Sequence, residues 1–537
     1  MIEDFDRCVR AVRSRDARFD GWFFTAVVTT RIYCRPSCPV APPRVENMTF
    51  YPSAAAAQLA GFRACKRCRP DATPGSPEWN VRGDTVARAM RLIADGVVDR
   101  EGVGGLATRL GYSTRQLQRL LFAEVGTGAL ALARAQRAQT ARLLIETTTI
   151  PMTDVAYGAG FASLRQFNAT VSDVFALTPT AMRASPTRPP AVRTSAEEGP
   201  GLQVGVGTVA LRLAFRRPLC PESLFGHLVA TAVPHCEEYR DGWYRRTLRL
   251  PHGAGVVALA PHADHITCRL ALADLRDLAV ATNRCRRLLD LDADPVAIDE
   301  ALGDDRALAP IIGRGRGRRV PGTVDANEMA LRAVLGQQVS TAAARTHAAR
   351  LVHQIGTPIG RLGLGYPDGL APAQGGGLTH LFPEASALVD LDPATLALPE
   401  RRRSAAIGLA RMLANGGIDL GAGGDWARAR AQLNAMAGLG PWTVETIAMR
   451  ALGDPDAFLP TDLGVRTAAA AVGLPRGAAS LTTHAERWRP WRAYAVQYLW
   501  STCEHAINRL PGAAVLSRST GPDRRRPRIA KHPERTA

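Results

Sequence analysis

The sequence predicts a multidomain α+β protein. Its 537 residues exceed the size at which a single hydrophobic core stops growing, so several domains are expected. Four cysteines cluster near the start, helical patterns fill residues 84–184 and 276–510, and strand-like alternation occupies residues 202–275. We therefore expect a small zinc-binding α/β module at 1–80, an all-α region, a β-rich subdomain and a second all-α domain, in that order.

The composition points to a polyanionic partner. Lys and Arg outnumber Asp and Glu by 67 to 49, which gives a formal net charge of +18. Such an excess favours nucleic acid, although an Arg-rich composition without such a partner is the alternative, and charge alone does not separate DNA from RNA or a membrane surface. No apolar run approaches the ~20 residues of a membrane-spanning helix, and the N-terminus lacks the pattern of a signal peptide. We expect a cytoplasmic protein with no membrane partner.

The cysteine cluster has metal-ligand spacing. Cys34-Arg-Pro-Ser-Cys38 and Cys65-Lys-Arg-Cys68 form two close pairs separated by a longer loop, and this pattern can enclose one tetrahedral Zn²⁺. Four unrelated thiols and a purely structural zinc site are the alternatives. Four thiolates around one Zn²⁺ carry a formal charge of about −2, so their sulfurs stay deprotonated and electron-rich. Such a sulfur can attack an electrophilic methyl group, which turns one thiolate into a neutral thioether. The spacing does not say which cysteine would react.

The segments around these cysteines, residues 24–38 and 61–71, resemble the N-terminal module of the Ada-type adaptive-response regulators. The resemblance implies that Cys34 irreversibly accepts a methyl group from a DNA methylphosphotriester and that Cys38, Cys65 and Cys68 complete the zinc site. Ada-type proteins often carry a second methyltransferase with a Pro-Cys-His-Arg motif. That motif does not occur here, so we expect no repair of O6-methylguanine.

Two helix-turn-helix patterns follow, at residues 103–122 and 152–167. Either one alone could be an ordinary helical hairpin, but a long helix near residues 134–146 joins the two, and the pair is similar to the AraC-type DNA-binding domain. One departure is Gly128-Ala129, where that family usually has Ser-Pro. The resemblance implies promoter binding to double-stranded DNA, with RNA polymerase as a partner. The second helix of each motif offers side chains that can read base edges: Arg115, Gln116 and Arg119, then Arg165, Gln166 and Asn168.

Three segments of the C-terminal half suggest base excision. Gly438 and Gly440 form a tight turn before a helix whose N-terminus suits a DNA phosphate. Asp462 follows at a distance that could return its carboxylate to this turn, although a helix cap is the alternative role. Upstream, Gln337 and Gln338 complete a third element.

Together these segments resemble the helix-hairpin-helix glycosylases, specifically the AlkA-type 3-methyladenine glycosylases, over residues 202–510. The resemblance implies that Asp462 is catalytic, that Trp442 and Trp500 line the base pocket, and that Gln338 lies on the loop that wedges into the base stack. The family usually has an apolar wedge, so Gln338 is a departure. Trp442 stands where lyases of the superfamily have a Schiff-base lysine, so we expect hydrolysis without strand cleavage.

The expected layout is a zinc methyl-acceptor domain at 1–80, an AraC-type domain at 84–184 and a linker at 185–201. An AlkA-type β-rich subdomain at 202–275, a helix-hairpin-helix domain at 276–510 and a basic tail at 511–537 follow. The implied protein both regulates transcription and repairs alkylated DNA. A non-enzymatic transcription factor with a structural zinc site and a silent glycosylase fold is the alternative. The sequence leaves the oligomeric state open.

Overall fold

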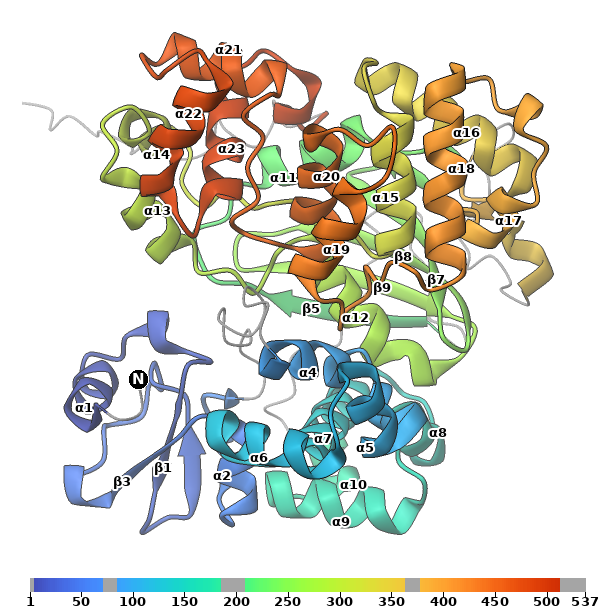
Figure 1. The fold of residues 1–537 in the computed structure, drawn as a ribbon. Helices are drawn as coiled ribbons and strands as arrows, with labels where there is room; N and C mark the ends of the chain where they lie inside the picture. Colours follow the sequence, from blue (N-terminus) through green and yellow to red (C-terminus); the bar gives the residue numbers. More distant parts are fainter. Residues whose placement is uncertain (1–3, 71–84, 185–207, 363–376, 512–537) are drawn as a thin grey trace, which may run out of the picture.

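The computed structural model describes residues 4–70, 85–184, 208–362 and 377–511. The predicted linker at 185–201 and, apart from Pro511, the predicted tail lie outside these residues. Four parts are visible: a zinc module (residues 4–70), a reading module (85–184), a sheet subdomain (208–272) and a helical core (278–511). In Figure 1 the sheet subdomain lies across the middle, with the zinc and reading modules below it and most of the helical core above it.

The zinc module is a small α/β unit, as expected. Its sheet has the order β3-β1-β2-β4, in which β2 and β4 are parallel and the other pairs are antiparallel. Because β2 and β4 are parallel neighbours, Cys34 at the end of β2 lies beside Cys65, which directly follows β4. The elements are α1 (Phe5–Arg13), β1 (Phe24–Val27), β2 (Ile32–Cys34), β3 (Met48–Tyr51), α2 (Ala54–Leu59) and β4 (Arg63–Ala64).

The reading module is entirely helical in its described residues. Its longest helix, α7, joins two helix-turn-helix units, and the turn of the first unit passes through Gly111 with a positive φ of 77°. This is the conformation that glycine adopts without steric cost. The helices are α4 (Thr85–Ala94), α5 (Val97–Leu110), α6 (Thr114–Val125), α7 (Ala129–Thr147), α8 (Met152–Gly158), α9 (Leu164–Phe175) and α10 (Pro179–Ala184).

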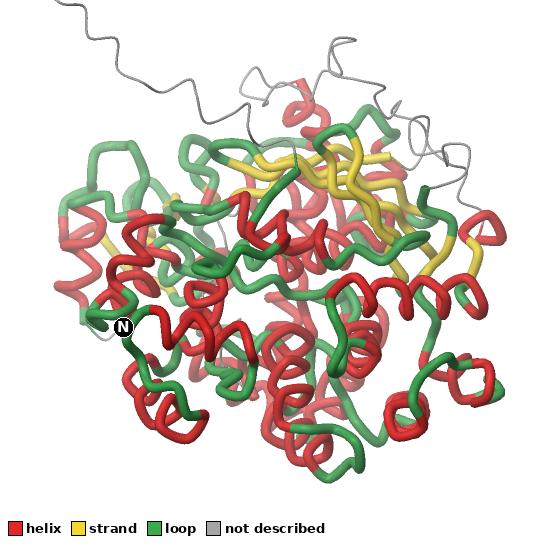
Figure 2. The backbone as a smooth tube through the Cα atoms, turned by 90° about the horizontal axis from the view of Figure 1, so that it is seen from above, coloured by secondary structure: helices red, strands yellow, loops and turns green. Residues whose placement is uncertain are grey.

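The sheet subdomain is a five-stranded antiparallel sheet with the order β5-β9-β8-β7-β6. One of its faces shares a hydrophobic core with α7, α8 and α9 of the reading module and with the zinc module. Seen from above, the strands lie together along one side of the molecule (Figure 2). The elements are β5 (Thr208–Ala214), α11 (Pro221–Ala230), β6 (Glu237–Arg240), β7 (Trp243–Leu250), β8 (Gly253–Pro261) and β9 (His265–Leu272).

The helical core surrounds the largest buried cluster of the described residues. Its one departure from an all-α domain is a two-stranded ribbon, β10 (Thr357–Pro358) and β11 (His380–Leu381). The helices are α12 (Leu278–Leu288), α13 (Pro295–Gly303), α14 (Ala309–Arg314), α15 (Ala326–Leu335), α16 (Thr341–Ile355), α17 (Ala385–Val389), α18 (Glu400–Ala414), α19 (Trp426–Asn434), α20 (Pro441–Ile447), α21 (Leu463–Ala471), α22 (Ala478–Ala485) and α23 (Arg492–Trp500). In the parts of the chain that the structure describes, no helix has the length and apolarity needed to cross a membrane.

Candidate functional site

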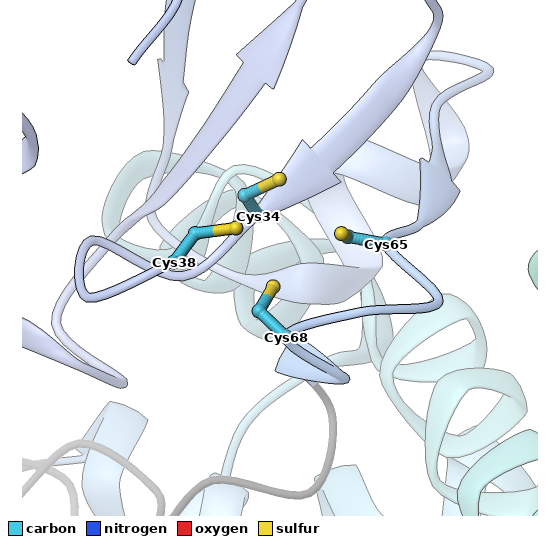
Figure 3. Close-up of side chains that lie close together, drawn as sticks. All are labelled: Cys34, Cys38, Cys65 and Cys68. Carbon is cyan, nitrogen blue, oxygen red and sulfur yellow. The ribbon is translucent and has the colours of Figure 1, made fainter. Parts of the chain in front are cut away.

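The four predicted zinc ligands converge. The Sγ atoms of Cys34, Cys38, Cys65 and Cys68 all lie within 4.8 Å of one another and point toward a common centre (Figure 3). Zn–S bonds of about 2.3 Å would place tetrahedral sulfurs about 3.8 Å apart, so this arrangement fits one zinc ion. No other group of three or more potential ligands meets this spacing within the described residues. Cys34 is partly exposed, whereas the other three side chains are at most 9% exposed.

A buried carboxylate fixes the loop between Cys34 and Cys38. Asp20 accepts hydrogen bonds from the backbone N–H of Ser37 (3.0 Å) and from its hydroxyl (2.6 Å), and Arg35 lies 3.6 Å away. Burial raises the pKa of the Asp20 carboxyl above its usual value, and the bonds from Ser37 and the charge of Arg35 oppose this rise. Asp20 therefore anchors the loop that joins the first two cysteines, and Cys34 is the one partly exposed member of the four.

The six predicted DNA-reading side chains lie on two helices and are all exposed. Arg115, Gln116 and Arg119 lie on α6, and the other three lie on α9. Ser113 caps α6 through a capping box: the Ser113 hydroxyl oxygen accepts the Gln116 backbone N–H (3.3 Å), and the Gln116 side-chain oxygen accepts the Ser113 backbone N–H (3.2 Å). Gln116 therefore has a structural role besides the reading role that the sequence suggests.

The glycine turn before α20 has the expected form. Gly438 has a φ of 85°, and Gly440 is the N-cap residue of α20, with no side-chain cap. Gln337, on the loop between α15 and α16, donates hydrogen bonds to the Gly438 carbonyl oxygen (3.1 Å) and to the Thr443 hydroxyl (2.8 Å). Gln338 is exposed and has a φ of 54°, a backbone conformation that residues other than glycine rarely adopt. The two loops therefore form one surface, with Gln338 projecting beside the turn.

Asp462 accepts hydrogen bonds from both predicted pocket tryptophans. The indole Nε1 of Trp442 donates to Oδ2 over 2.9 Å, and the indole Nε1 of Trp500 donates to Oδ1 over 2.9 Å. Oδ1 also accepts the Val465 N–H, so Asp462 is the N-cap of α21 as well. All three side chains of the Asp–Trp group are partly exposed. The carboxylate is thus oriented by three donors, and Oδ2 keeps free acceptor capacity for a substrate or a water.

An ion-pair network holds the helices of the hairpin together. Arg430 on α19 binds Glu445 on α20 (2.8 Å) and Asp454 (2.7 Å). Burial disfavours the charged guanidinium, but the two carboxylates raise the pKa of Arg430 above its ordinary value. Glu445 also accepts the Phe458 N–H, on the segment that leads to Asp462. The network therefore links the helices on both sides of the glycine turn to the segment that carries Asp462.

Two residues that shape these sites were not identified from the sequence. Asp20 lies 17 positions from Ser37, and nothing local marks it as a partner of the cysteine loop. Gly464 lies in α21, where a Cβ atom would come within 3.2 Å of Asp462 Oδ1 and 3.3 Å of the Trp500 indole. The one available hint was a glycine in the first turn of a helix directly after the proposed catalytic residue.

Three family models match the chain in order. The metal binding domain of Ada matches residues 7–71, a helix-turn-helix domain matches 106–185, and the AlkA N-terminal domain matches 210–325. The last model extends beyond the sheet to include α12–α14. It therefore crosses the boundary between residues 275 and 276, where the sequence predicts that one domain ends and the next begins.

One curated relative matches nearly the whole chain, and others match parts of it. The chain is 58% identical over 511 residues to the "Probable bifunctional transcriptional activator/DNA repair enzyme AlkA" of Mycobacterium tuberculosis, covering 95% of this chain and 99% of the relative. It is 32% identical to the "DNA-3-methyladenine glycosylase 2" of Escherichia coli, covering 52% of this chain and 92% of that protein. It is 38% identical to the "Bifunctional transcriptional activator/DNA repair enzyme Ada" of Escherichia coli, over 26% of this chain and 37% of the relative.

The fold and sites define a DNA-binding regulator with a zinc module, joined to a helix-hairpin-helix glycosylase. The chain belongs to the family of bifunctional transcriptional activator/DNA repair enzymes that combine an Ada-type zinc domain with an AlkA-type glycosylase.

Proposed function

We propose that this protein repairs alkylated DNA by two reactions on separate sites and reports the damage to a promoter. Residues 1–80 transfer a methyl group from a DNA methylphosphotriester to Cys34, residues 84–184 read promoter DNA, and residues 202–510 excise alkylated bases such as 3-methyladenine. The observation that carries this proposal is the pairing of two complete sites on one chain: four convergent thiols, and a carboxylate held by two indoles.

Three features support Cys34 as the methyl acceptor. Cys34 is the one partly exposed residue of the four, and Asp20 fixes the loop that follows it. Exposed Arg63 precedes the second cysteine pair, and exposed Lys66 and Arg67 lie between its two members, where they can hold DNA phosphates. When bound, zinc keeps the thiols deprotonated. Cys34 Sγ attacks the methyl carbon, a C–S bond forms, and the C–O bond of the phosphotriester breaks. The phosphodiester leaves as the anion, and the thioether product is stable, so each molecule reacts once.

This reaction also changes charge. A thiolate becomes a neutral thioether, so the cluster loses one negative charge near a DNA-binding surface. The zinc module packs against α7 and α9, and Arg69, next to Cys68, forms an ion pair with Glu146 on α7. Methylation therefore favours promoter binding, and the exposed face of the reading module is then presented to RNA polymerase. We place the protein in the cytoplasm, on chromosomal DNA.

The Asp–Trp group supports hydrolytic base excision. A 3-methylated adenine is cationic and leaves with the electron pair of the glycosidic bond, so it needs little acid catalysis. The electron-rich faces of Trp442 and Trp500 attract such a flipped base. Asp462 Oδ2 stabilises the positive charge that develops on the sugar and accepts a hydrogen bond from the water that adds to C1′, while the proton of that water passes to solvent.

One experiment tests both reactions. Incubation of the zinc-loaded chain with methylated duplex DNA should add one methyl group to Cys34, found by peptide mass mapping, and should release 3-methyladenine without strand cleavage. A methyl group on another cysteine would contradict the acceptor assignment. Absence of base release would favour the alternative of a silent glycosylase fold.

A further inference from the structure

The reading module is docked onto the helical core through two arginines of α4. Arg88 Nε donates a 2.8 Å hydrogen bond to the Gly423 carbonyl oxygen, and Arg91 Nε donates a 2.9 Å bond to that of Ala422. The Arg91 guanidinium also lies 5.0 Å from the centroid of the Trp426 ring. Ala422 and Gly423 belong to the loop between α18 and α19, and Trp426 is the first residue of α19. This loop, residues 415–425, is called the dock loop below.

Shape and a second contact make this docking specific. A Cβ atom at Gly423 would come within 2.5 Å of the Leu92 side chain, so α4 packs directly on the backbone of the dock loop. At the end of α4, the Ala94 carbonyl oxygen accepts a 2.6 Å hydrogen bond from Asn283 of α12. Arg284 lies 3.5 Å from Asp95. Two separate points of attachment prevent α4 from rotating freely on the core.

The dock loop and the phosphate-binding turn lie at opposite ends of the same two helices. Helix α19 begins at Trp426, in the dock, and ends at Asn434, just before the turn at Gly438. Gly438 packs against Ala405, in the first half of α18, whereas the end of α18 enters the dock loop. At about 1.5 Å per residue, α18 and α19 are about 22 Å and 13 Å long. The dock is therefore on the side of the core away from its DNA-binding turn.

The docking leaves open the DNA face of the reading module and that of the helical core. The six reading side chains of α6 and α9 are exposed and take no part in the dock. The same holds for Gly438, Gly440 and Gln338. Figure 1 shows α9 and α10 at one end of the molecule and α16 and α21 at the other, with the sheet between them. A duplex held on α6 and α9 and a duplex held on the turn before α20 would lie on separate faces, because α4 docks at one end of α19 and the turn lies beyond its other end.

We propose that one molecule binds two DNA segments at once, a promoter duplex on the reading module and a damaged duplex on the helical core. This inference rests on the proposed function of each module. Duplex DNA has a persistence length of about 150 bp, so a short duplex cannot bend around the protein to fill both faces. The two segments are separate molecules or distant parts of one long molecule, and the protein bridges them.

Native mass spectrometry of the zinc-loaded full chain tests the bridge. The probes are two short duplexes of different length, one undamaged and one with a single tetrahydrofuran abasic analogue. We expect a complex of one 57.5 kDa chain with one copy of each duplex. Its mass separates it from a dimer that carries one duplex per subunit, and the dimer as the sole ternary species would overturn the proposal.

Two variants isolate the faces. The first is a triple variant that removes three cations from the reading face: Arg115→Ala, Arg119→Ala and Arg165→Ala. It should form complexes with the abasic duplex alone. Gly440→Glu places a carboxylate at the phosphate site without strain, because Gly440 has a φ of −84° and open space around its Cβ position, and it should leave binding to the reading face. If each variant binds one duplex but the parent chain never binds two, the bridge is wrong and the proposed function stands. If either variant binds no DNA at all, both the bridge and the proposed function of that module are wrong.

Discussion

The indole Nε1 of Trp500 donates a 2.9 Å hydrogen bond to Oδ1 of Asp462, across 38 positions of sequence. The same oxygen accepts the Val465 N–H, so the indole and the helix start orient one carboxylate together. Because the bond is made to a group that we propose to be charged, it should contribute more than a neutral hydrogen bond. Trp500 then acts on Asp462 as well as on the flipped base, and these two roles can be separated.

Trp500→Phe keeps an aromatic face and removes the donor. A hydrogen bond to a charged group is worth about 1.5–3 kcal/mol, so the single-turnover rate of 3-methyladenine release should fall by on the order of 10-fold or more. Affinity for an abasic duplex should change little, because the phosphate contacts that we propose lie at the turn before α20. A parental excision rate in Trp500→Phe would show that the ring face alone matters.

Gly464→Ala should separate stability from activity. Alanine is favoured over glycine in helices by up to ~1 kcal/mol, so thermal unfolding should occur at the same or a higher temperature. The added Cβ would lie 3.2–3.3 Å from Asp462 Oδ1 and the Trp500 indole, and it should push the indole away from the carboxylate. We expect a several-fold slower excision step in single-turnover assays. If the unfolding temperature falls together with the excision rate, the substitution has instead caused a packing defect.

Methylation of Cys34 should strengthen DNA binding most at low salt. The reaction removes one negative charge, and electrostatic interactions near a surface are screened as the ionic strength rises. Fluorescence anisotropy with methylated and unmethylated protein across a salt series measures the gain. Arg165→Ala serves as a control, since it should weaken both forms alike. Identical affinities of the two forms at every salt concentration would refute the coupling.

Local patterns predicted the parts of the fold whose stabilising contacts are close in sequence. The cysteine pairs, the Ser113 cap of α6 and the long helix α7 all follow from residues a few positions apart. Strand β7 lies inside the segment predicted to be β-rich but has no regular alternation of its own, because Arg245 and Arg246 interrupt it. Both are buried, and their charges are paired with carboxylates on other elements: Arg245 with Glu238, and Arg246 with Glu237 and Glu328. The helix α11, which interrupts the strands of this segment, was not predicted.

Contacts between modules were also beyond the sequence. The Arg88–Gly423 bond joins residues 335 positions apart, and neither residue belongs to a motif. The Asp–Trp group is an intermediate case: the resemblance brought its three members to the same site, but only the structure shows that both indole N–H groups point at the carboxylate. Side-chain direction depends on how α20, α21 and α23 pack, and periodicity does not encode it.

Asp462→Asn tests the proposed chemistry most directly. Asparagine caps helices as well as aspartate does, so the Val465 N–H keeps an acceptor and the fold should be retained. The negative charge is lost, and one indole N–H then faces an amide NH₂ instead of an oxygen. If the carboxylate stabilises positive charge on the sugar, the excision step should slow by on the order of 10²–10³-fold or more.

Asp456→Asn is a matched control for this variant. It makes the same chemical change six positions earlier, on a carboxylate that pairs with Arg492 (2.7 Å). It should lose some stability but excise 3-methyladenine at close to the parental rate. Methyl transfer to Cys34 should survive in both variants, because it uses a separate module. If Asp462→Asn excises the base as fast as Asp456→Asn in single turnover, Asp462 serves only as the cap of α21, and the charge that assists base release must come from another residue.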